Sequence, residues 1–342
     1  MKRVLILGSG GVGAITAVAL ESSGKAEVTL IVRGDYDTVT TSGYQINSID
    51  YGNIKNWKPS HVVKTIEEAS KAGPYDYVVV CTKFIPELQK TEELIKPVVQ
   101  KGTSIVLVQN GIGNEEPVMK AFPDAYVMGA VSLIGSINYN AEIKHTGPDS
   151  IVVGTYDKRP EAIAAAKEYT EIYDSSKSTA EYTDDLAKRR WQKLMYNATY
   201  NTVAALTGLD TGRMFFSGID QSIIVPAMAE LRLIAETELN EKLDDGIEEF
   251  LLNCDANEYY DPSMLVDVKK GQLMELEAIL GNPLRSAVKN NVEAPLLKTI
   301  YRLLHGKQLA MLEKRGVITL PEPGFDVATA KPLFAPEPWA AK

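Results

Sequence analysis

The sequence is poor in the residues that build disulfide frameworks and metal centres. It holds only two cysteines, Cys81 within an apolar run and Cys254 far along the chain. Two cysteines placed in this way do not indicate a disulfide framework, so we expect both to be buried free thiols. Its three histidines stand apart, without the spacing of metal ligands. Metal catalysis is therefore not indicated, and no bound metal is expected.

Excess basic charge and long apolar runs are also missing. The formal net charge is −9 over 342 residues, which works against nucleic acid or an anionic membrane as a partner, because both require a basic face. No stretch reaches the roughly 18 apolar residues that cross a bilayer. The apolar run after the N-terminus is too short for a secretory signal. We therefore expect a cytoplasmic protein with a small-molecule substrate.

The first half of the chain carries short apolar runs that alternate with stretches of helical period. The runs begin at Val4, Val28, Tyr77, Ser104 and Tyr126. Runs of this length, rich in β-branched residues, predict a parallel sheet that is buried on both faces, as in a doubly wound domain.

Two further patterns extend this interpretation of the first half. The alternation over residues 142–156 predicts antiparallel strands at the edge of the sheet. Pro86 stands at a favoured first position for a helix that follows the run at Tyr77.

After about residue 183 the strand-like runs end and long patterns of helical period take over. The sequence thus predicts an α/β N-terminal Rossmann-type dinucleotide-binding domain followed by an all-α C-terminal domain. We place the domains at residues 1–180 and 181–325, with a C-terminal tail over 326–342. A chain of this length favours two domains and a site between them. The amphipathic stretch 294–312 could bury its apolar face within the domain or, in a homodimer, on a second copy.

A glycine-rich loop follows the first predicted strand. Residues 8–13 read GSGGVG, which places Gly8, Gly10 and Gly13 in the G-x-G-x-x-G pattern with Ser9, Gly11 and Val12 between them. In this pattern one glycine makes the tight turn, one lets the backbone approach a pyrophosphate and one packs the helix closely. Its position between a strand and a helix predicts dinucleotide binding, against the alternative of a mere glycine-rich turn.

Arg33 stands at the end of the second predicted strand, where an NAD-binding domain usually carries an acid. A guanidinium can bind a 2′-phosphate through paired hydrogen bonds, whereas a carboxylate would repel it. The sequence therefore favours NADPH/NADP as the cofactor. Asp35, two residues further on, argues in the opposite direction.

Lys83 and Asn110 follow the strands at Tyr77 and Ser104. Side chains at the carboxyl ends of parallel strands line the ligand site of open α/β sheets. We therefore expect Lys83 to meet cofactor charge, and Asn110 to contact the nicotinamide amide or the substrate.

Lys193, Asn197 and Asn201 repeat at every fourth position within WQKLMYNATYN. On an α-helix this spacing covers an arc of about 80°. The three side chains therefore form a polar stripe beside apolar positions, which is either a site or a solvated helix face.

These elements, taken in order, resemble the ketopantoate reductase (2-dehydropantoate 2-reductase) family. The shared pattern is the glycine loop, Arg33, Lys83, the Asn-Gly at Asn110, and the Lys-Asn-Asn stripe, and the resemblance covers nearly the whole chain. A serine followed twelve residues later by a glutamate completes it, at Ser263 and Glu275.

The resemblance implies NADPH-dependent reduction of 2-dehydropantoate (ketopantoate) to pantoate, on the route to pantothenate and coenzyme A. It implies Lys193 as the general acid with Glu275 beside it. By the same resemblance, Asn110, Asn197, Asn201 and Ser263 would bind the substrate. The alternatives are a reductase of another 2-oxo acid or ketone on the same fold, and a non-catalytic NADP(H)-binding regulatory protein.

One geometric condition applies to the pair Ser263 and Glu275. Twelve residues of unbroken helix would hold them about 18 Å apart, too far for both to contact one small acid. The helix must therefore break, and Gly271 is the predicted stop, with a new helix near Leu273.

Overall fold

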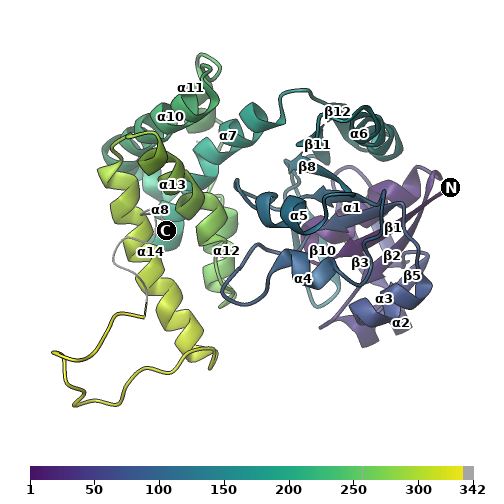
Figure 1. Ribbon diagram of the computed structural model, residues 1–342, viewed down its shortest axis with the longest axis horizontal. Coiled ribbons are helices and arrows are strands. Elements are labelled where there is room, and N and C mark those ends of the chain that lie inside the picture. The colour runs from purple at the N-terminus through teal and green to yellow at the C-terminus, as the bar shows by residue number, and fades with distance from the viewer. Residues whose placement is uncertain (256, 334–342) are drawn as a thin grey trace. The chain divides into compact units, whose positions relative to one another are not determined.

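The computed structural model describes residues 1–255 and 257–333, which form two compact units. Unit 1 comprises residues 1–109 and 114–189, and unit 2 comprises residues 110–113 and the described residues from 190 onward. Residues 326–333 are exposed and form only turns and bends, whereas the rest of the predicted tail lies outside the described residues. Figure 1 colours the chain from its N-terminus to its C-terminus.

Unit 1 is built on an eight-stranded sheet that contains all five predicted strands. Every neighbouring pair in it is parallel except β8 and β11. In spatial order the strands are β12 (Thr179–Tyr182), β11 (Ser150–Thr155), β8 (Tyr126–Ser132), β7 (Ser104–Leu107), β6 (Tyr77–Val80), β1 (Lys2–Leu7), β2 (Ala26–Ile31) and β5 (His61–Val63).

Helices cover both faces of this sheet. Alternate side chains of each strand point to opposite faces, and because both sets are apolar, both faces must be buried. On β1, Val4 and Ile6 join a core with α1 (Gly11–Ser22) and α6 (Pro160–Tyr173). Leu5 and Leu7 join a separate core with α3 (Ile66–Ala72), α4 (Thr91–Ile95) and α5 (Glu116–Ala121). The predicted doubly wound domain is therefore confirmed.

A second, four-stranded sheet was not predicted. Its order is β4 (Gly52–Trp57), β3 (Tyr44–Ser48), β10 (Glu142–His145) and β9 (Ser136–Tyr139), and α2 (Tyr36–Ser42) leads into it. The prediction for residues 142–156 is thus half wrong. β11 joins the large sheet, but β12 and not β11 forms its edge. β10 pairs with β3 in the small sheet instead. Alternation identifies a strand but not its partner, which tertiary packing decides.

The helix predicted from Pro86 starts later than predicted. The residues that follow Ile85 form a turn, in which the backbone N–H groups of Leu88 and Gln89 donate to the Ile85 carbonyl. α4 begins only at Thr91. A proline at a favoured first position permits a helix there without forcing one.

Unit 2 is helical, and within the described residues no strand follows β12, which confirms the all-α second domain. α7 (Leu186–Tyr196) enters the unit at Arg190. It is followed by α8 (Thr202–Thr207), α9 (Thr211–Phe216), α10 (Val225–Leu239), α11 (Ile247–Asn253), α12 (Ser263–Lys269), α13 (Asn282–Lys289) and α14 (Pro295–Lys314). In the part of the unit that the structure describes, three π-helical turns interrupt this series: η1 (Asn197–Asn201), η2 (Asp220–Ile224) and η3 (Glu277–Gly281).

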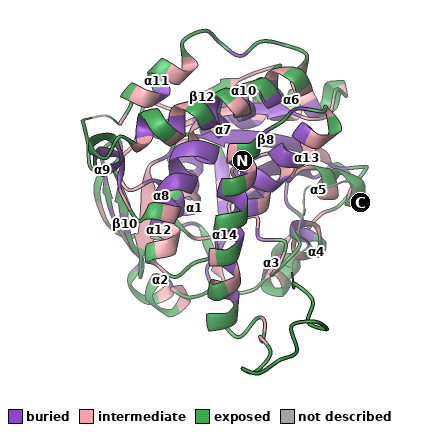
Figure 2. Ribbon diagram, turned by 90° about the vertical axis from the view of Figure 1, so that its left-hand side faces the viewer, coloured by how far each residue is buried: buried purple, intermediate pink, exposed green. Residues whose placement is uncertain are grey.

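The amphipathic stretch 294–312 forms α14. Its apolar residues Leu297, Ile300, Tyr301 and Leu304 pack into the hydrophobic core of unit 2. Figure 2 shows the opposite face of α14 as largely exposed and α8 as largely buried. The apolar face of α14 is therefore buried within the unit, and the homodimer stays a prediction.

Cys81 and Cys254 are both free. Cys254 is exposed at the end of α11 and Cys81 is partly buried, so the prediction of two buried thiols is wrong for Cys254 and only partly met by Cys81. Among the described residues, no cluster of three or more potential ligand side chains could hold a metal ion. No helix in the described part of the chain is both long and apolar enough to span a membrane.

Candidate functional site

The glycine loop of unit 1 has the geometry of a dinucleotide cradle. Gly8 adopts φ +104°, and a Cβ there would lie 2.7 Å from the Thr82 nitrogen. A Cβ at Gly13 would overlap the Gly8 carbonyl, so α1 packs closely against the turn. At Gly10, the N-cap of α1, a Cβ would meet nothing within 4 Å, which leaves the backbone open to a ligand. The loop thus fits a pyrophosphate at a helix N-terminus.

The residues expected to select the cofactor lie at the ends of β2 and β6. Arg33 is exposed two residues after β2. The amide of Asn138 donates to the Ser9 carbonyl at 2.8 Å and to the Asp35 carboxylate at 2.9 Å, so Asp35 lies beside the glycine loop. Lys83 is exposed three residues after β6, next to the segment that packs on Gly8. Unit 1 therefore presents both a guanidinium and a carboxylate close to the loop.

In unit 2, Asn110 joins Lys193 to Glu275. The Lys193 Nζ donates to the Asn110 Oδ1 at 2.7 Å, and the Asn110 Nδ2 donates to the Glu275 Oε2 at 3.3 Å. Glu275 is 6% exposed and Lys193 is partly buried. An amide, a carboxylate and an ammonium far apart in sequence are thereby held in one chain of hydrogen bonds.

The surroundings of Lys193 lower its pKa to about 8. The first cause is burial, which disfavours the charged amine, and the second is the positive charge of Arg190. Glu275 acts in the opposite sense and raises the pKa. The ammonium is thus charged at neutral pH and still a much stronger acid than an ordinary lysine.

The polar stripe continues from Lys193 through a π-helical turn. Asn197 and Asn201 lie in η1, and the Asn201 amide donates to the Asn197 Oδ1 at 3.1 Å. Four residues of α-helix advance about 40° beyond a full turn, whereas four residues of a wider π turn fall short of one. The two offsets oppose each other, so the stripe is straighter than the predicted arc of about 80°. Both asparagines are buried, which excludes the alternative of a solvated face.

Ser263 and Glu275 both join this stripe. The Asn201 Nδ2 donates to the Ser263 Oγ at 2.9 Å, while Glu275 is held through Asn110. The predicted break is confirmed, because α12 ends at Lys269 and Gly271 adopts φ +65°. The next helical turn, η3, starts at Glu277, later than the predicted position near Leu273. A non-helical segment lies between and carries Glu275.

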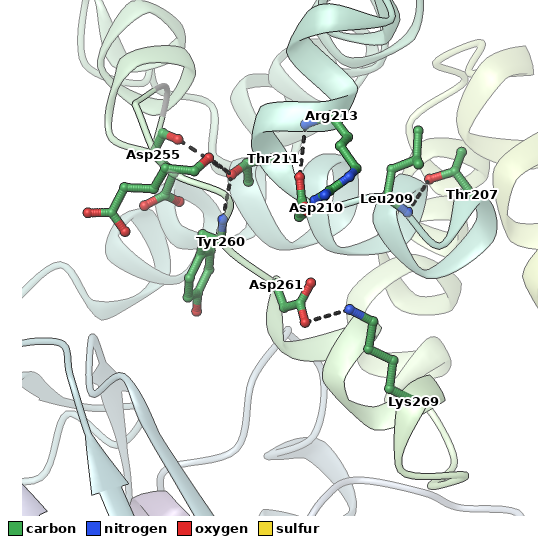
Figure 3. Close-up of polar contacts among 10 residues, drawn as sticks. Thr207, Leu209, Asp210, Thr211, Arg213, Asp255, Tyr260, Asp261 and Lys269 are labelled. Carbon is green, nitrogen blue, oxygen red and sulfur yellow. Dashed lines mark hydrogen bonds and ion pairs between the residues drawn. The ribbon is translucent and has the colours of Figure 1, made fainter.

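The segment that leads into Ser263 is anchored to α9. The Thr211 hydroxyl donates to the Glu258 carbonyl at 3.1 Å and accepts from the Tyr260 N–H at 3.2 Å. Figure 3 shows this contact together with the ion pair between Asp261, which precedes α12, and Lys269, the last residue of α12. The approach to Ser263 is therefore fixed from both sides.

Arg190 and the loop 110–113 were not identified from the sequence. Asn110 stands in the first half of the chain, yet the loop packs with unit 2. The buried Arg190 donates through its Nε to the Gly111 carbonyl at 2.9 Å. Its spacing of three residues from Lys193 places both on one helix face, a signal that could have revealed it.

Two family models match the chain in succession. The description "Ketopantoate reductase PanE/ApbA" covers residues 4–158, and "Ketopantoate reductase PanE/ApbA C terminal" covers residues 185–308.

Curated proteins and solved structures agree with these models. An uncharacterized protein of Saccharomyces cerevisiae, YDL144C, is 37% identical, over 94% of this chain and 98% of its own. The crystal structure of 2-dehydropantoate 2-reductase from Geobacter metallireducens has 27% identity and a TM-score of 0.80, over 89% of this chain and 99% of that one. The ternary structure of D-mandelate dehydrogenase with NADH and anilino(oxo)acetate, at 22% identity and a TM-score of 0.78 over 90% and 99%, shares the fold. The chain therefore belongs to the ketopantoate reductase PanE/ApbA family of nicotinamide-dependent oxidoreductases.

Proposed function

We propose that this protein reduces 2-dehydropantoate to pantoate with NADPH, and that Lys193 is the general acid. The observation that carries the proposal is the continuous polar stripe of unit 2, in which Lys193 is held by Asn110 and extended by Asn197 and Asn201. Titratable and amide groups set in one row can bind the carbonyl, the carboxylate and a hydroxyl of one small acid.

Lys193 would act on the carbonyl oxygen of the substrate. The nicotinamide, when bound, supplies the hydride that the ketone carbon gains. Negative charge then builds on the oxygen, and a positioned ammonium both stabilises that charge and delivers the proton. Asn110 and Glu275 would orient the ammonium, because they hold it through one chain of hydrogen bonds. Afterwards Lys193 regains its proton from solvent.

Asn201 favours a substrate that carries a hydroxyl. Its Nδ2 already donates to Asn197 and to Ser263, while its Oδ1 is buried without a hydrogen-bond partner. An unpaired buried acceptor costs about 1–3 kcal/mol, which a hydroxyl donor on the substrate would offset. 2-Dehydropantoate carries such a hydroxyl, and a 2-oxo acid with a hydrocarbon side chain does not. Ser263, which accepts from Asn201, keeps its own O–H for the substrate carboxylate.

NADPH as the cofactor rests on Arg33. The exposed guanidinium can pair with a 2′-phosphate, and one oxygen of the Asp35 carboxylate is already occupied, because it accepts a hydrogen bond from Asn138. Lys83, exposed after β6, would add positive charge near the cofactor phosphates. These groups support NADPH over NADH.

The second candidate is a reductase of another 2-oxo acid on the same fold. The likeness to a D-mandelate dehydrogenase, whose structure holds NADH and an aryl oxo acid, favours it. A non-catalytic role is disfavoured, since an inert protein has no need to bury Glu275 and to lower the pKa of Lys193. We further propose a cytoplasmic protein that forms a homodimer.

The test is the initial rate of NADPH oxidation with purified protein and 2-dehydropantoate, beside NADH and a panel of 2-oxo acids with and without a hydroxyl. We expect NADPH-dependent turnover that is fastest with 2-dehydropantoate. Faster turnover of phenylglyoxylate, the oxo acid of mandelate, would establish the second candidate. NADPH binding without turnover of any compound would contradict both.

A further inference from the structure

A second buried cation lies one helical turn before the proposed acid. Arg190 is 5% exposed, and its position three residues before Lys193 places both on the same face of α7. Burying a guanidinium beside an ammonium costs free energy unless hydrogen bonds and opposite charges compensate it. This arrangement therefore calls for a specific role.

Arg190 is hydrogen-bonded to the loop of residues 110–113. Its Nε donates to the Gly111 carbonyl at 2.9 Å. Gly111 adopts φ +81°, and a Cβ there would overlap Ala278 in η3. The next residue, Ile112, donates its N–H to the Ala278 carbonyl at 3.0 Å and accepts from the Asn282 amide at 2.6 Å. The loop 110–113 is thus fastened to η3 and α13 on one side and to α7, by Arg190, on the other.

The fastened loop sets the position of Asn110. Asn110 directly precedes Gly111 and accepts the Lys193 Nζ hydrogen bond at 2.7 Å. Arg190 and Lys193, on adjacent turns of one helix, therefore donate hydrogen bonds to adjacent residues of one loop. A displacement of the Gly111 carbonyl would move Asn110 away from Lys193.

Arg190 also acts on Lys193 through charge. Within unit 2, the charged groups that act on the Lys193 ammonium include Arg190 on its own helix and Glu275 on the segment before η3. Arg190 disfavours the charged form of the lysine and Glu275 favours it. The two residues thus set the acidity of Lys193 from opposite directions.

We propose that Arg190 is a positioning residue for the proposed reduction, which fixes the 110–113 loop so that Asn110 holds Lys193, and which opposes the charge of Glu275 at the ammonium. The inference deepens the proposed function and rests on it for its catalytic part. Its electrostatic part concerns the free protein and can be measured without turnover.

The first experiment follows the titration of Lys193 by NMR in protein labelled with ¹³C at lysine Cε. The resonance is assigned by its loss in Lys193→Ala. We expect a wild-type midpoint near 8 and a rise of about one pH unit in Arg190→Gln, since a neighbouring positive charge is lost. Arg190→Lys keeps the charge and should keep the midpoint. Equal midpoints in wild type and Arg190→Gln would overturn the electrostatic part, whether or not the substrate assignment is correct.

The second experiment measures kcat against pH with NADPH and 2-dehydropantoate, or with the 2-oxo acid that the wild type reduces fastest. Arg190→Met, which lacks both the donor and the charge, should lose about tenfold or more in kcat, and its basic limb should move to higher pH. Arg190→Gln, which keeps an amide donor, should lose less kcat but show the same shift. Arg189→Met is the matched control, because Arg189 is exposed on the same helix and should behave as wild type.

The outcomes separate the two proposals. Wild-type kcat and pH profile in Arg190→Met, together with a collapse of kcat in Lys193→Ala, would overturn only the role of Arg190. Full turnover in Lys193→Ala would overturn the general acid itself. If Arg190→Met does not fold, judged by circular dichroism, the Gln and Lys variants carry the test.

Discussion

Removing the charge of Glu275 should lower kcat at high pH and leave kcat nearly unchanged at low pH. Glu275 raises the pKa of Lys193, whereas burial and Arg190 lower it. In Glu275→Gln the shape of the side chain and an acceptor for Asn110 remain, but the negative charge is lost. The pKa of Lys193 should therefore fall below its value of about 8.

The magnitude follows from the protonated fraction of Lys193. If the pKa falls by about one unit, as for the loss of one neighbouring charge, the ammonium fraction at about pH 7.5 drops from about three-quarters to about one-quarter. At about pH 9 the loss grows to about ninefold, and at about pH 6 it is below about 10%. The proton is needed on the lysine, so activity is present below the pKa and is lost as the pH rises through it.

The assay is kcat for NADPH oxidation at saturating 2-oxo acid between about pH 5.5 and pH 9.5. Glu277→Gln provides a control two residues further along the chain, at the start of η3, because Glu277 pairs with Arg285. A uniform loss of rate at every pH, without movement of the basic limb, would refute the electrostatic argument. It would leave Glu275 with an orienting role only.

Three further predictions address the acid, the cofactor and the support of Ser263. Lys193→Ala should lower kcat by on the order of 10²-fold or more, while Lys188→Ala on the same helix should not, and near-full turnover in the first variant would contradict the general-acid role. Arg33→Ala should raise KM for NADPH and leave KM for NADH nearly unchanged, so that an unaltered preference would exclude pairing with the 2′-phosphate. Thr211→Val removes an acceptor for the Tyr260 N–H and should cost about 1–3 kcal/mol in urea unfolding, whereas Thr299→Val, at an exposed hydroxyl of α14, should cost far less.

The organisation of the chain could be predicted because it depends on local pattern. The strands β1, β2, β6, β7 and β8 follow from short β-branched runs, and the helical unit follows from long runs of helical period. The break at Gly271 could be predicted as well, since only a residue that tolerates positive φ ends a helix in this way. The small sheet escaped prediction because its pairing of β3 with β10 joins segments about a hundred residues apart.

The sequence by itself determined which chemistry-bearing residues this protein has and on which kind of element each lies. The glycine loop directly after a strand and the Lys-Asn-Asn spacing on one helix face are local properties, and the family resemblance follows from their order. Only the tertiary structure decided that Asn110 bridges Lys193 and Glu275, that Arg190 fastens the Gly111 carbonyl, and that a π turn straightens the stripe. These are contacts between residues up to about 165 positions apart. They depend on how the core of unit 2 packs, and no local pattern encodes that packing.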